Sequence, residues 1–311
     1  MIAYVFPGQG SQRVEMGKDL YDNFPVARQI FEEADSALGF NLSEMCFEGM
    51  AEDLALTANT QPAILTVSTA AFRAMENQGF PMPDFVAGHS LGEYSALVAA
   101  NAISFTDAVK TVRKRGTYMQ EAVRIGTGAM AAILGLDLET IENACREAAN
   151  GQVCSPANLN SPLQTVIAGN AEAIDRAIEI LKERGAKRAI KLNVSAPFHC
   201  LLMKPAQDKL ADDLQEINFE NLIFPVIENV SAAENIKGAR VREALTMQVS
   251  APVRWADSIE NLISNSVETF VEVGTGKILT GLVRQINRDV RCLNVENTLS
   301  LKEAKEILIN K

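Results

Sequence analysis

The sequence lacks the features that mark membrane, secreted and zinc-binding proteins. No apolar run reaches membrane-spanning length. The first residues include no basic region or cleavage site, so we expect no secretory signal. The 5 cysteines are scattered, and no two form a Cys-x-x-Cys pair. This pattern favours reduced thiols, and we expect a cytoplasmic protein without a metal centre.

Basic residues are also scarce, with 29 Lys and Arg against 39 Asp and Glu and a net charge of −10. Non-specific nucleic-acid binding needs a basic footprint, so we exclude it. An acidic partner could dock only on a local basic patch. The length of 311 residues suits one large α/β domain, or a main domain with a smaller one inserted.

The most informative stretch is Gly-His-Ser-Leu-Gly at residues 88–92. It follows a short apolar strand at 84–87 and precedes a small, apolar helix at 91–100. Strand, sharp turn and helix is the context in which Gly-x-Ser-x-Gly forms a nucleophile elbow, with Ser90 as the nucleophile. The N–H of Leu91 would then point to where an oxyanion forms. The alternative is a glycine-rich turn that closes a βα unit.

A second glycine-rich loop, residues 7–12, follows the first strand at 2–6. Its Gly-x-Gly hints at dinucleotide binding, but position 13 is Arg13, and no acidic residue closes a second strand about 20 residues later. We therefore reject NAD binding. The loop can still bring a backbone N–H to the active site, and Gln9 is the candidate.

Helical spacing predicts helices at 17–38, at 59–78 with Asn59 or Thr60 as the cap, and at 104–125. Arg115 lies close to the apolar stripe of the third helix, with no acid three or four residues away. A buried arginine needs an anion. The partner is either a distant acid or a substrate carboxylate held in a two-pronged contact.

Residues 126–196 read as β-α-β-β-α-β, the ferredoxin-like order, and form a predicted small domain. The surrounding segments, 1–125 and 197–311, alternate strands and helices, with strands expected at 222–227 and 269–273. Such alternation implies a mostly parallel sheet with helices on both faces. We expect an α/β protein with an α/β-hydrolase-like main domain and an inserted ferredoxin-like domain.

A serine nucleophile needs a base, and the chain has only 2 histidines. His89 adjoins Ser90, and adjacent side chains on an elbow diverge, so His199 is the only realistic histidine base. Otherwise His199 is a polar residue at a domain junction. No acid between the two can be nominated to orient His199. A dyad oriented by a backbone carbonyl is equally compatible with the sequence.

Together these stretches resemble the malonyl-CoA:acyl carrier protein transacylases, from residue 2 to about residue 290. The motifs are Phe-Pro-Gly-Gln-Gly-Ser-Gln at 6–12, Gly-His-Ser-Leu-Gly-Glu at 88–93, Arg-Gly at 115–116, Asn-Leu-Asn-Ser-Pro at 158–162, Pro-Phe-His at 197–199 and Gln-x-x-x-Pro-Val-x-Trp at 248–255. The set is specific, whereas any one motif would not be.

The resemblance implies that Ser90 takes malonyl from coenzyme A as an ester while His199 relays the proton. The backbone carbonyl of Gln248 would orient His199. The N–H groups of Gln9 and Leu91 would form the oxyanion hole. The pantetheine arm of acyl carrier protein would then accept malonyl in a ping-pong cycle, with no cofactor beyond the coenzyme A thioester substrate.

The resemblance also implies how the acyl group is selected. Arg115 would hold the malonyl carboxylate, and Phe198 would disfavour a branched methylmalonyl group. Asn158 and Asn160 would line the thioester cleft, although polar loop packing explains them equally well. Three alternatives stay open: a serine esterase or thioesterase, a non-catalytic subunit, and a transacylase that serves a polyketide pathway.

Overall fold

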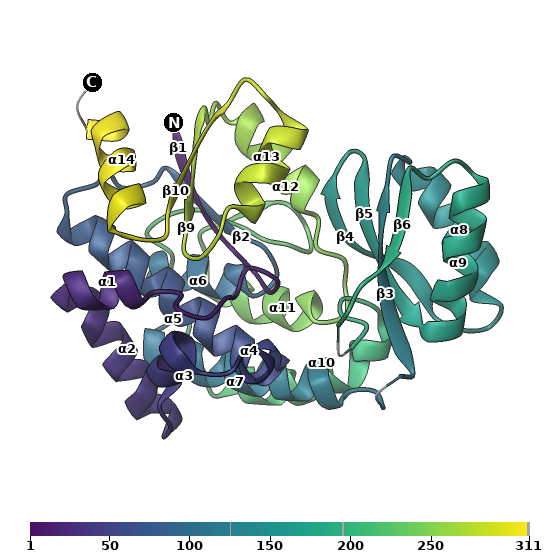
Figure 1. Cartoon of the computed structure of the whole chain (residues 1–311), viewed down its shortest axis with the longest axis horizontal. Helices are drawn as coiled ribbons and strands as arrows, with labels where there is room; N and C mark the ends of the chain where they lie inside the picture. Colours follow the sequence, from purple (N-terminus) through teal and green to yellow (C-terminus); the bar gives the residue numbers. More distant parts are fainter. Residues whose placement is uncertain (125, 195, 310–311) are drawn as a thin grey trace.

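The computed structural model describes residues 1–124, 126–194 and 196–309, which form two sheets (Figure 1). The predicted last residue of the helix 104–125, and of the segment 1–125, lies outside the described residues. We call residues 1–124 and 196–309 the large lobe, and residues 126–194 the small lobe. Each lobe contains one of the two sheets.

The sheet of the large lobe is mostly parallel. Its strand order is β10 (Arg291–Val295), β9 (Thr269–Val273), β1 (Ile2–Phe6), β2 (Phe85–Gly88), β7 (Val226–Ile227) and β8 (Glu234–Asn235). Only the last pair is antiparallel. The predicted α/β class with a mostly parallel sheet is therefore confirmed.

Helices cover both faces of this sheet. Successive strand residues point to opposite faces, and both sets are apolar, so each face needs a covering layer. Tyr4 and Phe6 face a large apolar cluster, whereas Ala3 and Val5 face a second cluster with Trp255. The helices are α1 (Lys18–Asn23), α2 (Pro25–Leu38), α3 (Leu42–Glu48), α4 (Ala51–Ala55), α5 (Thr57–Asn77), α6 (Gly92–Ala99), α7 (Phe105–Glu121), α10 (Lys204–Gln215), α11 (Gly238–Gln248), α12 (Trp255–Ser264), α13 (Ile278–Ile286) and α14 (Thr298–Ile309), with a 3₁₀ turn at Leu201–Met203.

The small lobe has the predicted element order: β3 (Gly128–Leu134), α8 (Leu138–Ala149), β4 (Cys154–Ser161), β5 (Gln164–Asn170), α9 (Ala171–Glu183) and β6 (Arg188–Lys191). Its strands are all antiparallel, in the order β4-β5-β3-β6. This arrangement is ferredoxin-like. Figure 1 shows α8 and α9 together on the outer side of the sheet.

The two faces of the small sheet have different neighbours. Ala131 and Ile133 pack against α8 and α9 in a separate core. Met130 and Val166, from the other face, join the main apolar cluster of the large lobe. The separate core supports the predicted division into 1–125, 126–196 and 197–311, which stays a proposal.

Three helix and strand predictions were wrong in detail. The helix predicted at 17–38 is two helices, because Phe24 before Pro25 is extended, as residues before proline prefer. Helix α5 begins at Thr57, so Asn59 and Thr60 lie inside it, and the Thr60 hydroxyl donates to backbone carbonyls rather than capping. The strand expected at 222–227 is reduced to Val226–Ile227.

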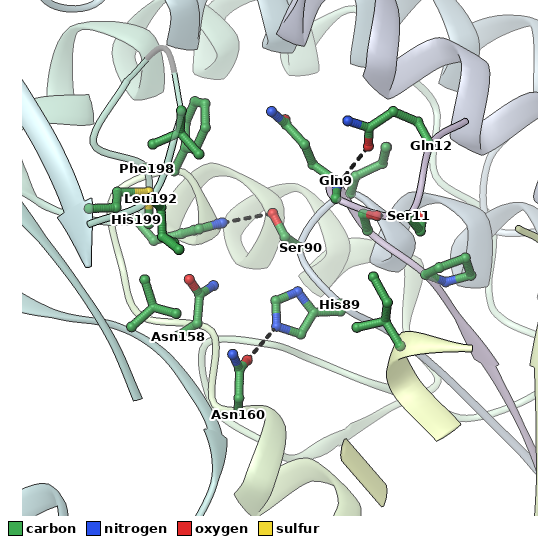
Figure 2. Close-up of a pocket in the computed structure, with 18 of the residues that line it drawn as sticks. Gln9, Ser11, Gln12, His89, Ser90, Asn158, Asn160, Leu192, Phe198 and His199 are labelled. Carbon is green, nitrogen blue, oxygen red and sulfur yellow. Dashed lines mark hydrogen bonds between the residues drawn. The ribbon is translucent and has the colours of Figure 1, made fainter. Parts of the chain in front are cut away.

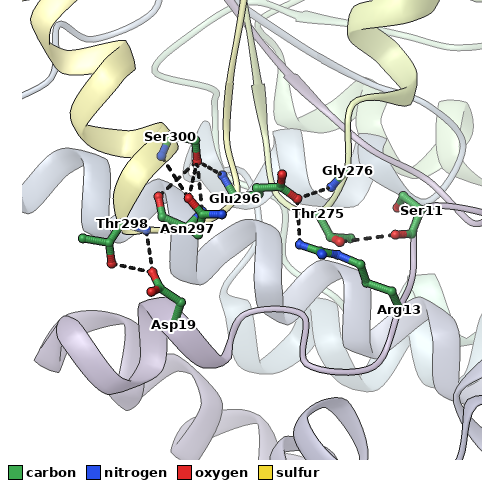
Figure 3. Close-up of polar contacts among 9 residues, drawn as sticks. All are labelled: Ser11, Arg13, Asp19, Thr275, Gly276, Glu296, Asn297, Thr298 and Ser300. Carbon is green, nitrogen blue, oxygen red and sulfur yellow. Dashed lines mark hydrogen bonds and ion pairs between the residues drawn. The ribbon is translucent and has the colours of Figure 1, made fainter.

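The C-terminal segment is joined to the N-terminal loop by polar contacts (Figure 3). The Arg13 guanidinium pairs with Glu296 at 2.9 Å, and the Glu296 carboxylate also accepts the Gly276 N–H at 3.0 Å. Thr275 donates its hydroxyl to the Ser11 carbonyl at 3.2 Å. The loop after β1 is thereby held by two segments from the end of the chain.

None of the helices in the described part of the chain has both the length and the apolar character needed to cross a bilayer. Nor does any group of three or more His, Cys, Asp or Glu side chains within it have an arrangement that could hold a metal ion.

Candidate active site

The turn between β2 and α6 holds Ser90 in a left-handed conformation, with φ of 52°. Such a conformation is strained for a serine and is typical of a nucleophile elbow. A Cβ on Gly88 would lie 1.9 Å from the Gly92 backbone, so only glycine fits there. Asn229 stabilises the turn, because its Oδ1 accepts the Ser90 N–H at 2.7 Å and its Nδ2 donates to the Gly88 carbonyl at 2.7 Å.

Ser90 and His199 lie in contact, as the sequence predicts. Ser90 Oγ is 2.7 Å from His199 Nε2, and His199 Nδ1 is 2.9 Å from the backbone carbonyl of Gln248 (Figure 2 shows the first pair). Because a carbonyl only accepts, Nδ1 carries the proton and Nε2 is free to accept the serine hydroxyl. Among the described residues, no carboxylate hydrogen-bonds to His199.

His199 is 3% exposed, and this burial changes its acid–base chemistry. Burial, followed by the nearby Arg115 cation, lowers the pKa of His199 to about 3. The imidazole is therefore neutral at neutral pH, which is the form that can accept a proton.

Arg115 is 1% exposed and has only neutral hydrogen-bond partners. Its Nη1 donates to Gln61 Oε1 at 2.7 Å, and its Nη2 donates to Gln248 Oε1 at 2.8 Å and to Ser90 Oγ at 3.1 Å. No carboxylate of the described residues pairs with it, so a distant acid as its direct partner is the wrong alternative. The Nε atom has no partner among the described residues. The guanidinium is a buried cation beside the nucleophile, with capacity for an anion.

A cavity of about 440 Å³ opens between the two lobes and contains Ser90 and His199 in its wall. Phe198 and Arg115 line it from the large lobe, and Asn158 and Asn160 line it from β4 of the small lobe. Figure 2 shows the two asparagines across the cavity from Phe198. All of the predicted site residues except Gln248 therefore line this cavity.

His89 points away from Ser90, as expected, but it also lines the cavity. Its Nε2 donates to Asn160 Oδ1 at 2.9 Å, and its ring lies 5.6 Å from the Trp255 ring. The hydrogen bond connects the elbow of the large lobe to β4 of the small lobe. The sequence excludes His89 as the base but gives no sign of this contact.

The loop after β1 lies against the elbow. A Cβ on Gly8 would be 2.4 Å from the His89 carbonyl oxygen, so glycine permits this approach. Gln9 and Leu91 both line the cavity. No group within the described ranges accepts a hydrogen bond from either backbone N–H. Both N–H groups are thus available to a ligand.

Besides His89, three site residues were not predicted from the sequence: Gln61, Asn229 and Glu93. Gln61 and Asn229 are polar residues in apolar or irregular segments, and no local pattern identifies them. Glu93 gave a usable signal, since it is the only charged residue in the apolar stretch 91–100. It is 2% exposed and accepts hydrogen bonds from the Gln248 side chain and the Asn229 N–H.

The fold and this serine–histidine pair define an acyl-transfer protein, and comparison with known proteins agrees. The sequence model of the protein family described as the acyl transferase domain matches residues 3–303. A malonyl CoA-acyl carrier protein transacylase of Bacillus subtilis (strain 168) is 50% identical over 308 residues, covering 99% of this chain and 97% of that protein. Its counterpart in Escherichia coli (strain K12) is 52% identical over 284 residues, covering 91% and 92%.

Solved structures give the same result. The transacylase of Coxiella burnetii superposes with a TM-score of 0.97 at 45% identity, covering 99% of this chain and 97% of that one. A malonyl-transacylase solved in complex with a type II PKS acyl-carrier protein has a TM-score of 0.96 at 47% identity, covering 100% and 99%. The chain belongs to the family of malonyl CoA-acyl carrier protein transacylases.

Proposed function

We propose that this protein transfers malonyl from malonyl-CoA to the phosphopantetheine thiol of acyl carrier protein and supplies fatty acid synthesis. The 2.7 Å contact between Ser90 Oγ and His199 Nε2, in a cavity that also holds a buried arginine, carries this assignment. The relatives named above support the choice of donor and acceptor. The donor is a thioester and the acceptor is a thiol, so the transfer requires no cofactor. We also propose a cytoplasmic location.

In the first half-reaction, Ser90 Oγ attacks the thioester carbonyl while its proton moves to His199 Nε2. The Gln248 carbonyl holds Nδ1–H and stabilises the imidazolium. The N–H groups of Gln9 and Leu91 donate to the developing oxyanion. The C–S bond then breaks, and the coenzyme A thiolate takes the proton from His199, leaving a malonyl ester on Ser90.

In the second half-reaction, the carrier's thiol gives its proton to His199 and attacks the ester carbonyl. The same two N–H groups stabilise the second oxyanion. The Ser90 oxygen leaves and recovers the proton, so the enzyme returns to its starting state. We propose that residues 126–196 act as a small domain that closes one side of the cavity and limits access of water to the ester.

Arg115 selects the acyl group. Its Nη2 is 3.1 Å from Ser90 Oγ, which is within reach of the carboxylate of a malonyl ester on that oxygen. An acetyl group would leave the buried guanidinium without an anion, so it should be a poor substrate. Phe198 narrows the cavity against a branched methylmalonyl group, and Asn158 and Asn160 bind the thioester arm.

Intact-protein mass measurement after addition of malonyl-CoA tests this proposal. We expect one malonyl adduct on the wild type, none on Ser90→Ala, and loss of the adduct when the phosphopantetheine form of acyl carrier protein is added. No adduct on the wild type would refute the transferase assignment. Loss of the adduct in buffer as fast as with carrier would favour a serine thioesterase or esterase.

One observation favours a second role, in polyketide synthesis. A relative of 47% identity was solved with a type II PKS acyl-carrier protein. The chemistry would be identical, and only the carrier differs. Transfer rates to a fatty acid carrier and to a polyketide carrier, compared at equal concentration, distinguish the two pathways.

A further inference from the structure

Glu93 is a buried carboxylate that takes no part in the steps above. It lies in the first turn of α6, three residues after Ser90, and is 2% exposed. Its Oε2 accepts hydrogen bonds from Gln248 Nε2 at 2.8 Å and from the Asn229 N–H at 3.1 Å. Across the described residues, Glu93 forms no direct ion pair. Burying a carboxylate without such a partner is costly, so its presence needs an explanation.

The Gln248 amide connects Glu93 to the active site. Its Nε2 donates to the Ser90 carbonyl at 2.9 Å and to Glu93, while its Oε1 accepts from Arg115 Nη2 at 2.8 Å. A flipped amide would turn its oxygen toward two acceptors and its N–H groups toward a guanidinium. The flipped form is therefore excluded, and Glu93 helps to hold the amide that holds Arg115.

The charge of Glu93 also reaches the guanidinium. Burial raises the pKa of Glu93 to about 7, with Glu228 adding to the rise and Arg115 opposing it. Tyr94 lies against the same guanidinium, and burial raises the pKa of its hydroxyl far above neutral pH. Glu228 pairs with Arg240 at 3.1 Å. His199 stays neutral in this range. Of Glu93, Tyr94 and His199, Glu93 is thus the one whose charge changes near neutral pH.

We infer that Glu93 is a positioning residue for Arg115, and that its charge sets how strongly the guanidinium binds the carboxylate of the incoming acyl group. This inference rests on the malonyl transfer proposed above. With malonyl bound, one cation faces two carboxylates. Ionised Glu93 competes with the substrate for Arg115, whereas protonated Glu93 does not. Malonyl-CoA therefore binds more tightly below neutral pH than above it.

The test is the KM for malonyl-CoA, and kcat, measured from about pH 6 to about pH 8 with acyl carrier protein as acceptor. In the wild type we expect a KM about fivefold lower at the acidic end, the lower range of typical coupling between sites. Glu93→Gln keeps an oxygen that can accept both hydrogen bonds but removes the charge. Its KM should be low and constant across this range, so at about pH 8 it binds malonyl-CoA about fivefold more tightly than the wild type.

Two further variants separate charge from shape. Glu93→Asp keeps the charge on a shorter side chain, so the pH dependence of KM should remain while kcat falls. Glu272→Gln removes a different buried carboxylate, one that accepts the N–H groups of Leu279 at 3.0 Å and Thr280 at 2.7 Å. This matched control should keep the pH dependence of the wild type.

Wild-type pH dependence of KM in Glu93→Gln overturns the inference, as does a loss of kcat in that variant with no change in the pH dependence. If Glu93→Gln does not fold, Glu93→Asp decides, because a constant KM in that folded variant also overturns it. The mass measurement on the same wild-type sample keeps the two proposals apart. A missing malonyl adduct refutes the transfer itself, whereas an adduct with a pH-independent KM refutes only the role of Glu93.

Discussion

The two lobes bring different kinds of group to the cavity. The large lobe provides the groups that move a proton or carry charge, namely Ser90, His199 and Arg115. The small lobe provides amides and apolar side chains, such as Asn160 and Val166. Charged groups need rigid, buried surroundings to keep their geometry, and the parallel sheet with helices on both faces supplies these. We therefore expect changes in the small lobe to affect substrate binding more than the chemical step.

The largest effect should come from His199, which contacts the nucleophile, whereas the other histidine of the large lobe, His89, contacts the small lobe. His199→Ala removes the proposed base and should lower the transfer rate by about 10³-fold, within the usual range for general-base catalysis. His89→Ala removes the link to Asn160 and should act mainly on KM. Steady-state kinetics of both variants checks this, and a larger loss of kcat in His89→Ala would contradict the assignment of the base.

The second effect concerns the buried cation of the large lobe. Arg115→Ala should lower malonyl transfer by about 10²-fold, as the loss of a buried charge-assisted contact predicts. Acetyl transfer should be spared or raised, because no unpaired cation is then left in the cavity. Parallel assays with malonyl-CoA and acetyl-CoA measure the ratio. An equal loss with both substrates would remove the carboxylate-binding role.

The third prediction uses the pH dependence of the large-lobe base. A lowered pKa means that His199 stays neutral as the pH falls, so it still accepts a proton below the usual histidine pKa of about 6.5. At saturating malonyl-CoA, the rate of Ser90 acylation should stay nearly constant from about pH 7 to about pH 5. Rapid-quench acylation measures it. A fall of about 25-fold between pH 7 and pH 5, which a base with the usual histidine pKa of about 6.5 would show, would contradict the lowered pKa.

The smallest effect should come from the small lobe. Asn160→Ala removes the hydrogen bond to His89. One such hydrogen bond is worth about 1 kcal/mol, so we expect KM to rise by a few-fold. The kcat should stay within about twofold of the wild-type value. Leu163→Ala is a suitable control, since this exposed residue lies outside the cavity. A large fall in kcat for Asn160→Ala would mean that the small lobe takes part in the chemistry.

The small lobe was the more predictable fold, and the large lobe the more predictable site. The β-α-β-β-α-β order could be read from local periodicity, because each element of the small lobe buries one face. In the large lobe, the break before Pro25 and the two-residue strand β7 depend on packing that periodicity does not report.

The reacting side chains were predictable because their types are rare and their motif is local. Ser90 follows from the elbow, and His199 follows from the presence of only 2 histidines. The residues that hold them were not predictable from spacing. Asn229 is 139 positions from Ser90 in the chain, and the Gln248 carbonyl that orients His199 is a backbone group, which any residue type could supply. Only the family resemblance indicated Gln248.

The contacts in Figure 3 between the loop after β1 and the C-terminal segment restrict where this enzyme can be truncated or tagged. The loop that presents the Gln9 amide is held at Ser11 by a hydrogen bond from Thr275. Two residues later, Arg13 forms an ion pair with Glu296, which lies just before the final helix. A deletion that removes β10 and α14 would take away Glu296, and also Val295 and Leu301 from the main apolar cluster, so it would weaken the core together with the support of this loop. The end of the chain therefore supports the loop that carries the Gln9 amide, and a tag placed after α14 disturbs this support less than a truncation does.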